Sequence, residues 1–286
     1  MSLAMVFTIL CIFCTALLGI LFRLSSAFNV RTSVIILINY ITCFIIGLIW
    51  NGNKMLHQFS IEWIPWILGF GLLFILGFNA FASAIRSSGL PIAVLFQKMS
   101  IVITVVAALF LGDPINSIQL LGWTSGILAI VLAYGTNTES ASNPFHFKTL
   151  IATLIISSAI EIGFLLLSKA TFLNPDFHTL FPGYLFLSAA LFGFAAFRIS
   201  NQPTKISKQE ISFGIALGLP NFFSIYFMLN ALQMEWSGVA FFPVLNCSVI
   251  IASALSGYYL FKDSLTSKLI IAILLSTISI LLISLF

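Results

Sequence analysis

Long apolar runs recur along the whole chain, and they constrain its fold more than any other feature of the sequence. Each run holds about 20 residues, enough for an α-helix to cross a lipid bilayer. The runs are continuous and do not alternate apolar with polar residues, which favours helices over a transmembrane barrel. With boundary errors of about 2–4 residues, we expect ten spans, at 3–22, 32–50, 63–85, 89–111, 116–134, 149–169, 179–197, 211–233, 239–261 and 267–285.

The composition agrees with a chain that lives in a membrane. Charged residues make up 7% and hydrophobic residues 60% of the 286 residues, and the mean hydropathy is +1.14. A typical soluble domain carries about 25% charged residues. We therefore expect an all-α integral membrane protein that crosses the inner or plasma membrane many times. The net charge of +4 does not indicate nucleic acid as a partner, because the basic residues lie at span ends, where they meet lipid headgroups.

The second half of the sequence repeats the first. With an offset of 149 residues, Ser88 and Gly89 fall on Ser237 and Gly238, and one extra residue then brings Asp113 onto Asp263. This predicts two five-helix repeats, at 1–135 and 148–286, joined by a polar linker at 136–147. Because five is an odd number, the second repeat is expected to be inverted in the membrane, as in many transporters.

Basic residues predict the orientation of the spans. Lys54 and Lys169 fall on one side of the expected topology. The nine on the other side are Arg23, Arg31, Arg86, Lys148, Arg198, Lys205, Lys208, Lys262 and Lys268. By the positive-inside rule, this bias places both termini outside the cytoplasm and the loop 200–210 inside it.

Two charged residues fall deep inside expected spans. Lys98 lies ten residues into its span and Glu161 twelve residues into another, so both are close to the middle of the bilayer. A charge at that depth costs roughly 2.5–3.5 kcal/mol on insertion scales, and it usually faces a partner or a cavity. One interpretation is a buried ion pair that locks two helices together. The other is a polar binding site that both residues line.

Further polar residues in the spans favour a binding site. They form stripes on several helices, although any single asparagine could simply bond to a neighbouring helix. The expected substrate-binding residues of this kind are Asn39, Tyr40, Asn79, Gln97, Tyr226, Asn230 and Asn246.

No residue pattern predicts catalysis, a metal or a cofactor. The cysteines Cys11, Cys14, Cys43 and Cys247 all fall within apolar spans, where they are expected to pack. The three histidines are scattered, without a paired carboxylate or nucleophile nearby. An integral-membrane enzyme is therefore the least favoured alternative, and we expect no catalytic or metal-binding residues and no cofactor.

The ten-span plan resembles the drug/metabolite transporter superfamily, specifically its EamA type. The stretches that carry the similarity are Gln97-Lys98-Met99-Ser100, Leu111-Gly112-Asp113 and Leu260-Phe261-Lys262-Asp263. The resemblance implies a transporter of ten helices with both termini in the cytoplasm. That orientation is opposite to the one that the basic residues predict.

A second stretch resembles the first helix of the small multidrug resistance proteins. The resemblance implies a membrane glutamate that binds a cation and a proton in turn. In that family a lysine follows this glutamate by eight residues. Glu161 and Lys169 have this spacing, whereas Thr15 stands in place of the glutamate in the first repeat, eight residues before Arg23. Thr15 is therefore included among the expected substrate-binding residues. With one glutamate and the added Lys98, a zwitterion or polar metabolite is favoured over a bulky cation.

These observations predict a secondary active transporter. We expect it to export an amino-acid-like or other small polar solute by alternating access, with proton coupling through Glu161, as a monomer or homodimer. The sequence contains no phosphate-binding loop that would indicate an ATPase. A multidrug or lipophilic-cation exporter is the main alternative.

Overall fold

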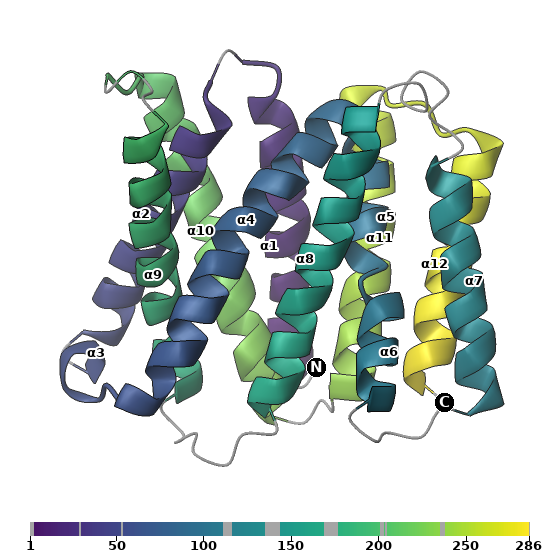
Figure 1. Ribbon diagram of the computed structural model, residues 1–286, viewed down its shortest axis with the longest axis horizontal. Coiled ribbons are helices and arrows are strands. Elements are labelled where there is room, and N and C mark those ends of the chain that lie inside the picture. The colour runs from purple at the N-terminus through teal and green to yellow at the C-terminus, as the bar shows by residue number, and fades with distance from the viewer. Residues whose placement is uncertain are drawn as a thin grey trace. The chain divides into compact units, whose positions relative to one another are not determined.

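The computed structural model describes residues 3–28, 30–52, 54–110, 116–134, 144–168, 177–200, 203, 205–234 and 238–285, which contain helices and no strand (Figure 1). The helices are α1 (Leu3–Ser25), α2 (Thr32–Asn51), α3 (Lys54–His57), the short 3₁₀ helix η1 (Ile61–Trp63), α4 (Ile64–Ser88), α5 (Leu90–Lys98), α6 (Ile101–Phe110), α7 (Ser117–Tyr134), α8 (Pro144–Ser168), α9 (Phe177–Ile199), α10 (Lys208–Met234), α11 (Gly238–Phe261) and α12 (Ser267–Leu285). The prediction of an all-helical chain is confirmed.

Seven helices in the described part of the chain are long and apolar enough to cross a membrane. They are α1, α2, α4, α8, α9, α10 and α11. The chain is therefore a multi-pass membrane protein. The remaining apolar stretches, at Leu90–Thr104, Ser117–Ala133 and Ser267–Ile283, are shorter. A total of ten spans stays a prediction.

The helices pack into two compact units, and each unit takes helices from both halves of the sequence. Unit 1 comprises Met1–Asn79 and Gly163–Glu235, and unit 2 comprises Ala80–Ile162 and Trp236–Phe286. This division describes packing, whereas the expected repeats at 1–135 and 148–286 divide the sequence. Of the expected linker at 136–147, residues 136–143 lie outside the described residues and α8 begins at Pro144.

Glycines allow the helices of unit 1 to approach closely. A Cβ atom added at Gly218 of α10 would lie 2.5 Å from Thr42 Cβ of α2, and one added at Gly47 of α2 would lie 2.9 Å from Gly183 Cα of α9. Gly214 and Gly218 are four residues apart, so they share one face of α10, the small-xxx-small arrangement that membrane helices use for tight contact. α2 is therefore held between α9 and α10.

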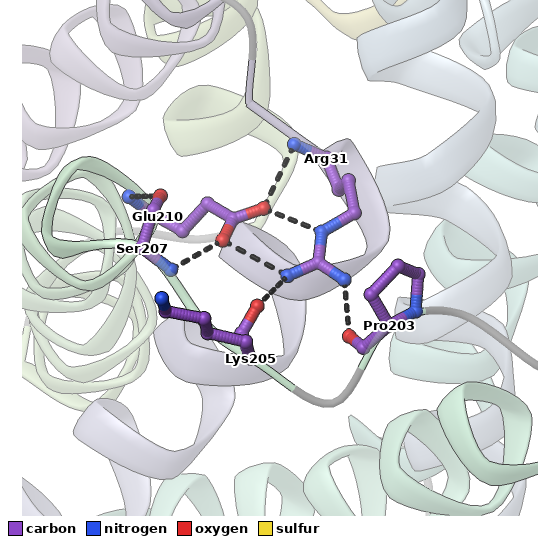
Figure 2. Close-up of polar contacts among 5 residues, drawn as sticks. All are labelled: Arg31, Pro203, Lys205, Ser207 and Glu210. Atoms are coloured by element: carbon purple, nitrogen blue, oxygen red, sulfur yellow. Dashed lines mark hydrogen bonds and ion pairs between the residues drawn. The ribbon is translucent and has the colours of Figure 1, made fainter.

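An ion pair joins the beginnings of α2 and α10 within unit 1 (Figure 2). Arg31 Nε donates to Glu210 Oε1 at 2.7 Å and Arg31 Nη2 to Oε2 at 3.0 Å, while the guanidinium also donates to the carbonyls of Pro203 and Lys205. Its hydrogen bond with Glu210 raises the pKa of Arg31 above the usual value, so the guanidinium stays charged. Two helices from different halves of the sequence are thereby fixed at one end.

Glu210 also caps its own helix. The Ser207 amide donates to Glu210 Oε2 at 2.8 Å, and the Glu210 amide donates to Ser207 Oγ at 3.2 Å. This reciprocal pair is a capping box, in which a serine and a glutamate three residues later satisfy the free amides of a helix start. One carboxylate thus serves both the helix end and the ion pair.

Glu210→Gln is expected to lower the apparent melting temperature in detergent by several degrees. The amide can accept hydrogen bonds but carries no charge to pair with Arg31, so the bidentate contact is weakened. The matched control is Glu62→Gln, which removes an equal charge from an exposed position. Equal melting temperatures for the two variants would contradict a stabilising role for the ion pair.

In unit 2, α7 and α12 form a tightly packed antiparallel pair, which lies side by side in Figure 1. Gln119 Nε2 donates to the Ile283 carbonyl at 3.3 Å, and Ser279 Oγ donates to the Gly122 carbonyl at 2.7 Å. A Cβ atom added at Gly126 would lie 2.6 Å from Ser279 Oγ. Gly122 and Gly126 thus allow the close packing of α7 against α12.

Gly126→Ala is expected to destabilise the protein by roughly 1–3 kcal/mol, because the added methyl group must push α12 or Val102 aside. Gly69→Ala in α4 is the matched control, since a Cβ atom there meets nothing within 4 Å. Alanine is also the better helix former by about 1 kcal/mol. Thermal unfolding in detergent should therefore separate the two variants, and a Gly126→Ala protein as stable as the control would contradict the packing argument.

The acidic residue that follows α11 contacts the start of α5 within unit 2. The Asp263 amide donates to the Gly257 carbonyl at 2.9 Å, and Lys262 has a positive φ of 59°, as is common just beyond a helix end. The Asp263 carboxylate lies 3.5 Å from the Cβ position of Gly89, which precedes α5. A negative charge is favourable at a helix N-terminus. Asp113, its expected repeat counterpart, lies outside the described residues.

The apolar run expected as one span at 89–111 is not a single continuous helix. The helix is interrupted at Met99 and Ser100, between α5 and α6. There the Val102 amide donates to the Met99 carbonyl, three residues back, at 3.0 Å. Hydroxyl groups approach the Ser100 carbonyl at the same place, and side chains that enter the backbone ladder are a recognised cause of helix breaks. Such a break in mid-helix often marks a hinge.

Candidate functional site

The break between α5 and α6 places a polar turn within an apolar stretch of the chain. Lys98 is the last residue of α5, and Ser100 lies in the turn that follows it. The Ser100 carbonyl accepts the amide hydrogens of Ile103 and Thr104 at 2.9 and 3.0 Å. Its own hydroxyl is buried and has no hydrogen-bond partner. The two half-helices therefore meet at a polar turn.

Glu161 of α8 lies beside this turn. Thr104 Oγ1 of α6 donates to Glu161 Oε2 at 3.2 Å, and the charge of the Lys98 ammonium also acts on the carboxylate. All of these residues belong to unit 2. The structure thus places the two charged residues that are expected near the middle of the membrane within electrostatic reach of each other.

Ser158 completes the polar group. Its hydroxyl lies 2.7 Å from the Leu154 carbonyl and 3.3 Å from the Ser100 carbonyl. We call Lys98, Ser100, Thr104, Ser158 and Glu161 the Glu161 cluster. Lys98, Thr104 and Glu161 are partly exposed, whereas Ser100 and Ser158 are buried. A partly exposed carboxylate and a partly exposed ammonium can receive a ligand of either charge.

Two of the expected site residues, Asn39 and Tyr40 of α2, are fully buried in unit 1. The Tyr40 hydroxyl donates to the Phe74 carbonyl at 2.7 Å. Asn221 Nδ2 donates to Asn39 Oδ1 at 3.2 Å, and Asn39 Nδ2 has no partner. In this conformation both side chains hold helices together.

Four more expected site residues also belong to unit 1, and all are partly exposed: Thr15, Asn79, Tyr226 and Asn230. Asn79 Nδ2 donates to the Ile75 carbonyl and Asn230 Nδ2 to the Tyr226 carbonyl, each one turn back on its own helix. The Tyr226 ring lies 5.6 Å from that of Trp50, edge to face. These amides are therefore satisfied along their own helices.

The last two expected residues, Gln97 of α5 and Asn246 of α11, belong to unit 2. Gln97 is partly exposed next to Lys98 in the chain, and Asn246 is only 2% exposed.

Sequence reasoning left Ser100, Thr104 and Ser158 out of the expected site. Ser158 precedes Glu161 by three residues, and Thr104 follows Ser100 by four. Both intervals place side chains on one helical face. These spacings were visible in the sequence, but the break that gathers the three residues around one carbonyl was not.

The described residues contain no group of three or more histidine, cysteine, aspartate or glutamate side chains that could hold a metal ion. An apolar cleft of about 310 Å³ lies within unit 1, lined by Pro65, Trp66, Gly69, Phe70, Leu73 and Gly163. Gly163 and Glu161 are two residues apart, so they point to nearly opposite sides of α8. The cleft therefore does not contain the Glu161 carboxylate.

Comparisons with known proteins bear on the fold alone. No protein-family profile matches the chain. An uncharacterized protein of Haemophilus influenzae is 23% identical over 269 residues, which cover 90% of this chain and 90% of that protein. The crystal structure of another protein superposes with a TM-score of 0.65 and 17% sequence identity over 99% of this chain and 98% of that one. The fold is thus shared along the whole length.

The Lys98–Glu161 interaction can be measured by a double-mutant cycle. Lys98→Met leaves the carboxylate without its positive neighbour, and Glu161→Gln leaves the ammonium without its negative one, so each single variant is expected to be less stable in detergent. The double variant should recover part of the loss, with a coupling of roughly 0.5–3 kcal/mol. Strictly additive losses would contradict a direct interaction between these two charges.

Proposed function

We propose that the chain is a secondary active transporter whose substrate binds at the Glu161 cluster. The observation that carries this proposal is that Glu161 lies beside a broken membrane helix, within electrostatic reach of Lys98 at the break. Charged residues inside a membrane usually mark the path of a substrate or ion. Transporters also commonly bind their substrates where a spanning helix is interrupted, because the turn offers polar backbone inside an apolar bundle.

The transporter would use ten spans in two inverted five-helix repeats. α7 has 18 residues and α12 has 19, so each is about 27–28 Å long, close to the thickness of the hydrocarbon core. Two helix contacts within unit 1 support this proposal. Gly71 of α4 approaches Ser188 of α9, and Gly218 of α10 approaches Asn39 of α2. With the 149-residue offset, Ser188 corresponds to Asn39 and Gly71 to a position two residues after Gly218.

The substrate would be a small zwitterion or other polar metabolite. An ammonium group and a carboxylate that act on each other electrostatically are neutral as a pair, so a ligand that carries both charges can engage each one and leave no charge unbalanced in the membrane. A free amino acid has this character. A lipophilic cation would instead leave Lys98 without a counter-ion.

Transport would proceed by alternating access, in the export direction and in the inner or plasma membrane, with the proton gradient as driving force. Glu161 is the carboxylate at which a proton and a substrate ammonium would compete. The similarity to the EamA type of the drug/metabolite transporters, carried by Gln97–Ser100, supports the same proposal.

The test is uptake into proteoliposomes with an imposed proton gradient. Candidate solutes, including amino acids, organic acids, nucleosides and lipophilic cations, are first screened for ligands that raise the melting temperature. Glu161→Gln, which mimics the protonated carboxyl, is expected to lose the pH dependence of substrate affinity and to lose gradient-driven accumulation by at least about tenfold, the loss expected for about 1.4 kcal/mol of coupling. The exposed Glu62→Gln variant is the control. Accumulation by Glu161→Gln equal to that of the control would contradict the assigned role.

A further inference from the structure

We infer that the hydroxyl of Thr104 links the charge on Glu161 to the helix break between α5 and α6. The inference rests on the proposed function only in taking Glu161 as the proton-carrying group. Thr104 Oγ1 lies 3.2 Å from Glu161 Oε2 and 3.1 Å from the Ser100 carbonyl oxygen. A threonine hydroxyl has one hydrogen, so it can donate to one of these two acceptors at a time.

Ser158 does not remove this competition. Its single hydrogen also has two acceptors in reach, but the Leu154 carbonyl is the nearer, at 2.7 Å against 3.3 Å for the Ser100 carbonyl. The shorter distance is the usual length of a hydroxyl hydrogen bond. Thr104 is therefore the side chain whose donation decides how firmly the Ser100 carbonyl is held.

The charge on Glu161 sets the direction of that donation. An ionised carboxylate draws the Thr104 hydrogen, because a charge-assisted hydrogen bond is about twice as strong as one to a neutral carbonyl. A protonated Glu161 can instead donate to Thr104 Oγ1, whose own hydrogen then goes to the Ser100 carbonyl. The ionised state loosens the first turn of α6, and the protonated state tightens it.

The surroundings of Glu161 support two states. Among the described residues, the charged group that acts on the carboxylate is Lys98 from α5, while α6 and the turn before it supply the hydroxyls of Thr104 and Ser100. The Ser100 hydroxyl is fully buried and lacks a hydrogen-bond partner. A protonated Glu161 carboxyl could donate a hydrogen bond to this hydroxyl oxygen. A protonated Glu161 can therefore donate to a hydroxyl oxygen of the cluster, whereas an ionised Glu161 can only accept.

Protonation of Glu161 would then also affect the backbone of α6. The Ile103 and Thr104 amides both donate to the Ser100 carbonyl, so the first turn of α6 depends on the same oxygen that the Thr104 hydroxyl contacts. Hinges of this kind need only a few residues at the end of a helix to absorb a change. Thr104 is a positioning residue that transmits the state of the carboxylate to the backbone.

The experiment measures amide hydrogen exchange at Ile103 and Thr104 in the full-length protein in lipid nanodiscs, from acidic to alkaline pH. Dividing each rate by that of Glu161→Gln removes the intrinsic effect of pH on exchange. The ratio is expected to rise roughly two- to tenfold as Glu161 ionises, the effect of losing one neutral hydrogen bond. Thr104→Val, which keeps the shape and loses the hydroxyl, should give a flat ratio, while Thr104→Ser and Ser158→Ala should keep the rise.

A rise that persists in Thr104→Val, or a flat ratio in the parent protein, would overturn the inference. Thr104→Ser and Ser158→Ala both retain a hydroxyl at position 104, so a flat ratio in either variant would also contradict the inference. The measurement needs no substrate and no flux. Its outcome is therefore separate from the transport assay, where the proposed function can fail while the exchange result stands.

Discussion

Every backbone carbonyl inside a membrane must find a donor within the protein, because hydrocarbon offers none. This requirement explains the arrangement around the break in the fourth expected span. Where α5 ends, the regular ladder of amide donors is interrupted, and the Ser100 carbonyl lies among the hydroxyls of Thr104 and Ser158 as well as backbone amides. Those hydroxyls bring polar character to a place where Glu161 and Lys98 can also lie.

The same requirement shapes the helix ends of both units. In unit 1 the guanidinium of Arg31 satisfies two loop carbonyls and the Glu210 carboxylate, which itself caps α10. In unit 2 the amide of Asp263 closes the end of α11. Basic and acidic residues at the span ends therefore stabilise the fold by specific bonds, in addition to any part they have in orienting the chain in the membrane.

The sequence predicts the class of the fold well, because each apolar run by itself is long enough to predict a membrane helix. An all-helical, multi-pass chain follows directly from them. The break at Met99–Ser100 has no such signal in the sequence, since neither proline nor glycine occurs there. It depends on hydroxyls, and one of them, Ser158, comes from another helix 58 residues away in the sequence. The residue pattern within one helix cannot predict a contact with a residue so far away in the sequence.

The pairing of Arg31 with Glu210 shows the same limit. The spacing of Ser207 and Glu210 is enough to predict their capping box, but Arg31, the partner of the Glu210 carboxylate, is 179 residues away in the sequence. Likewise, the polar residues on the spans do not share one role. Asn39 and Tyr40 are fully buried between helices, whereas Lys98 and Glu161 are partly exposed. Residue type and depth alone do not distinguish these two situations, because both satisfy the rule that polar groups avoid lipid.

A comparison of the two acid–base pairs explains why they suit different tasks. Arg31 engages Glu210 through two parallel hydrogen bonds, and the carboxylate also accepts a backbone amide, so any loss of charge would leave several donors unsatisfied. Such a pair is a fixed anchor. Around Glu161, by contrast, one threonine hydrogen serves two acceptors and one buried serine hydroxyl has no partner. A proton added there satisfies groups that were competing, so the second pair can change its state at low cost while the first holds the helices in place.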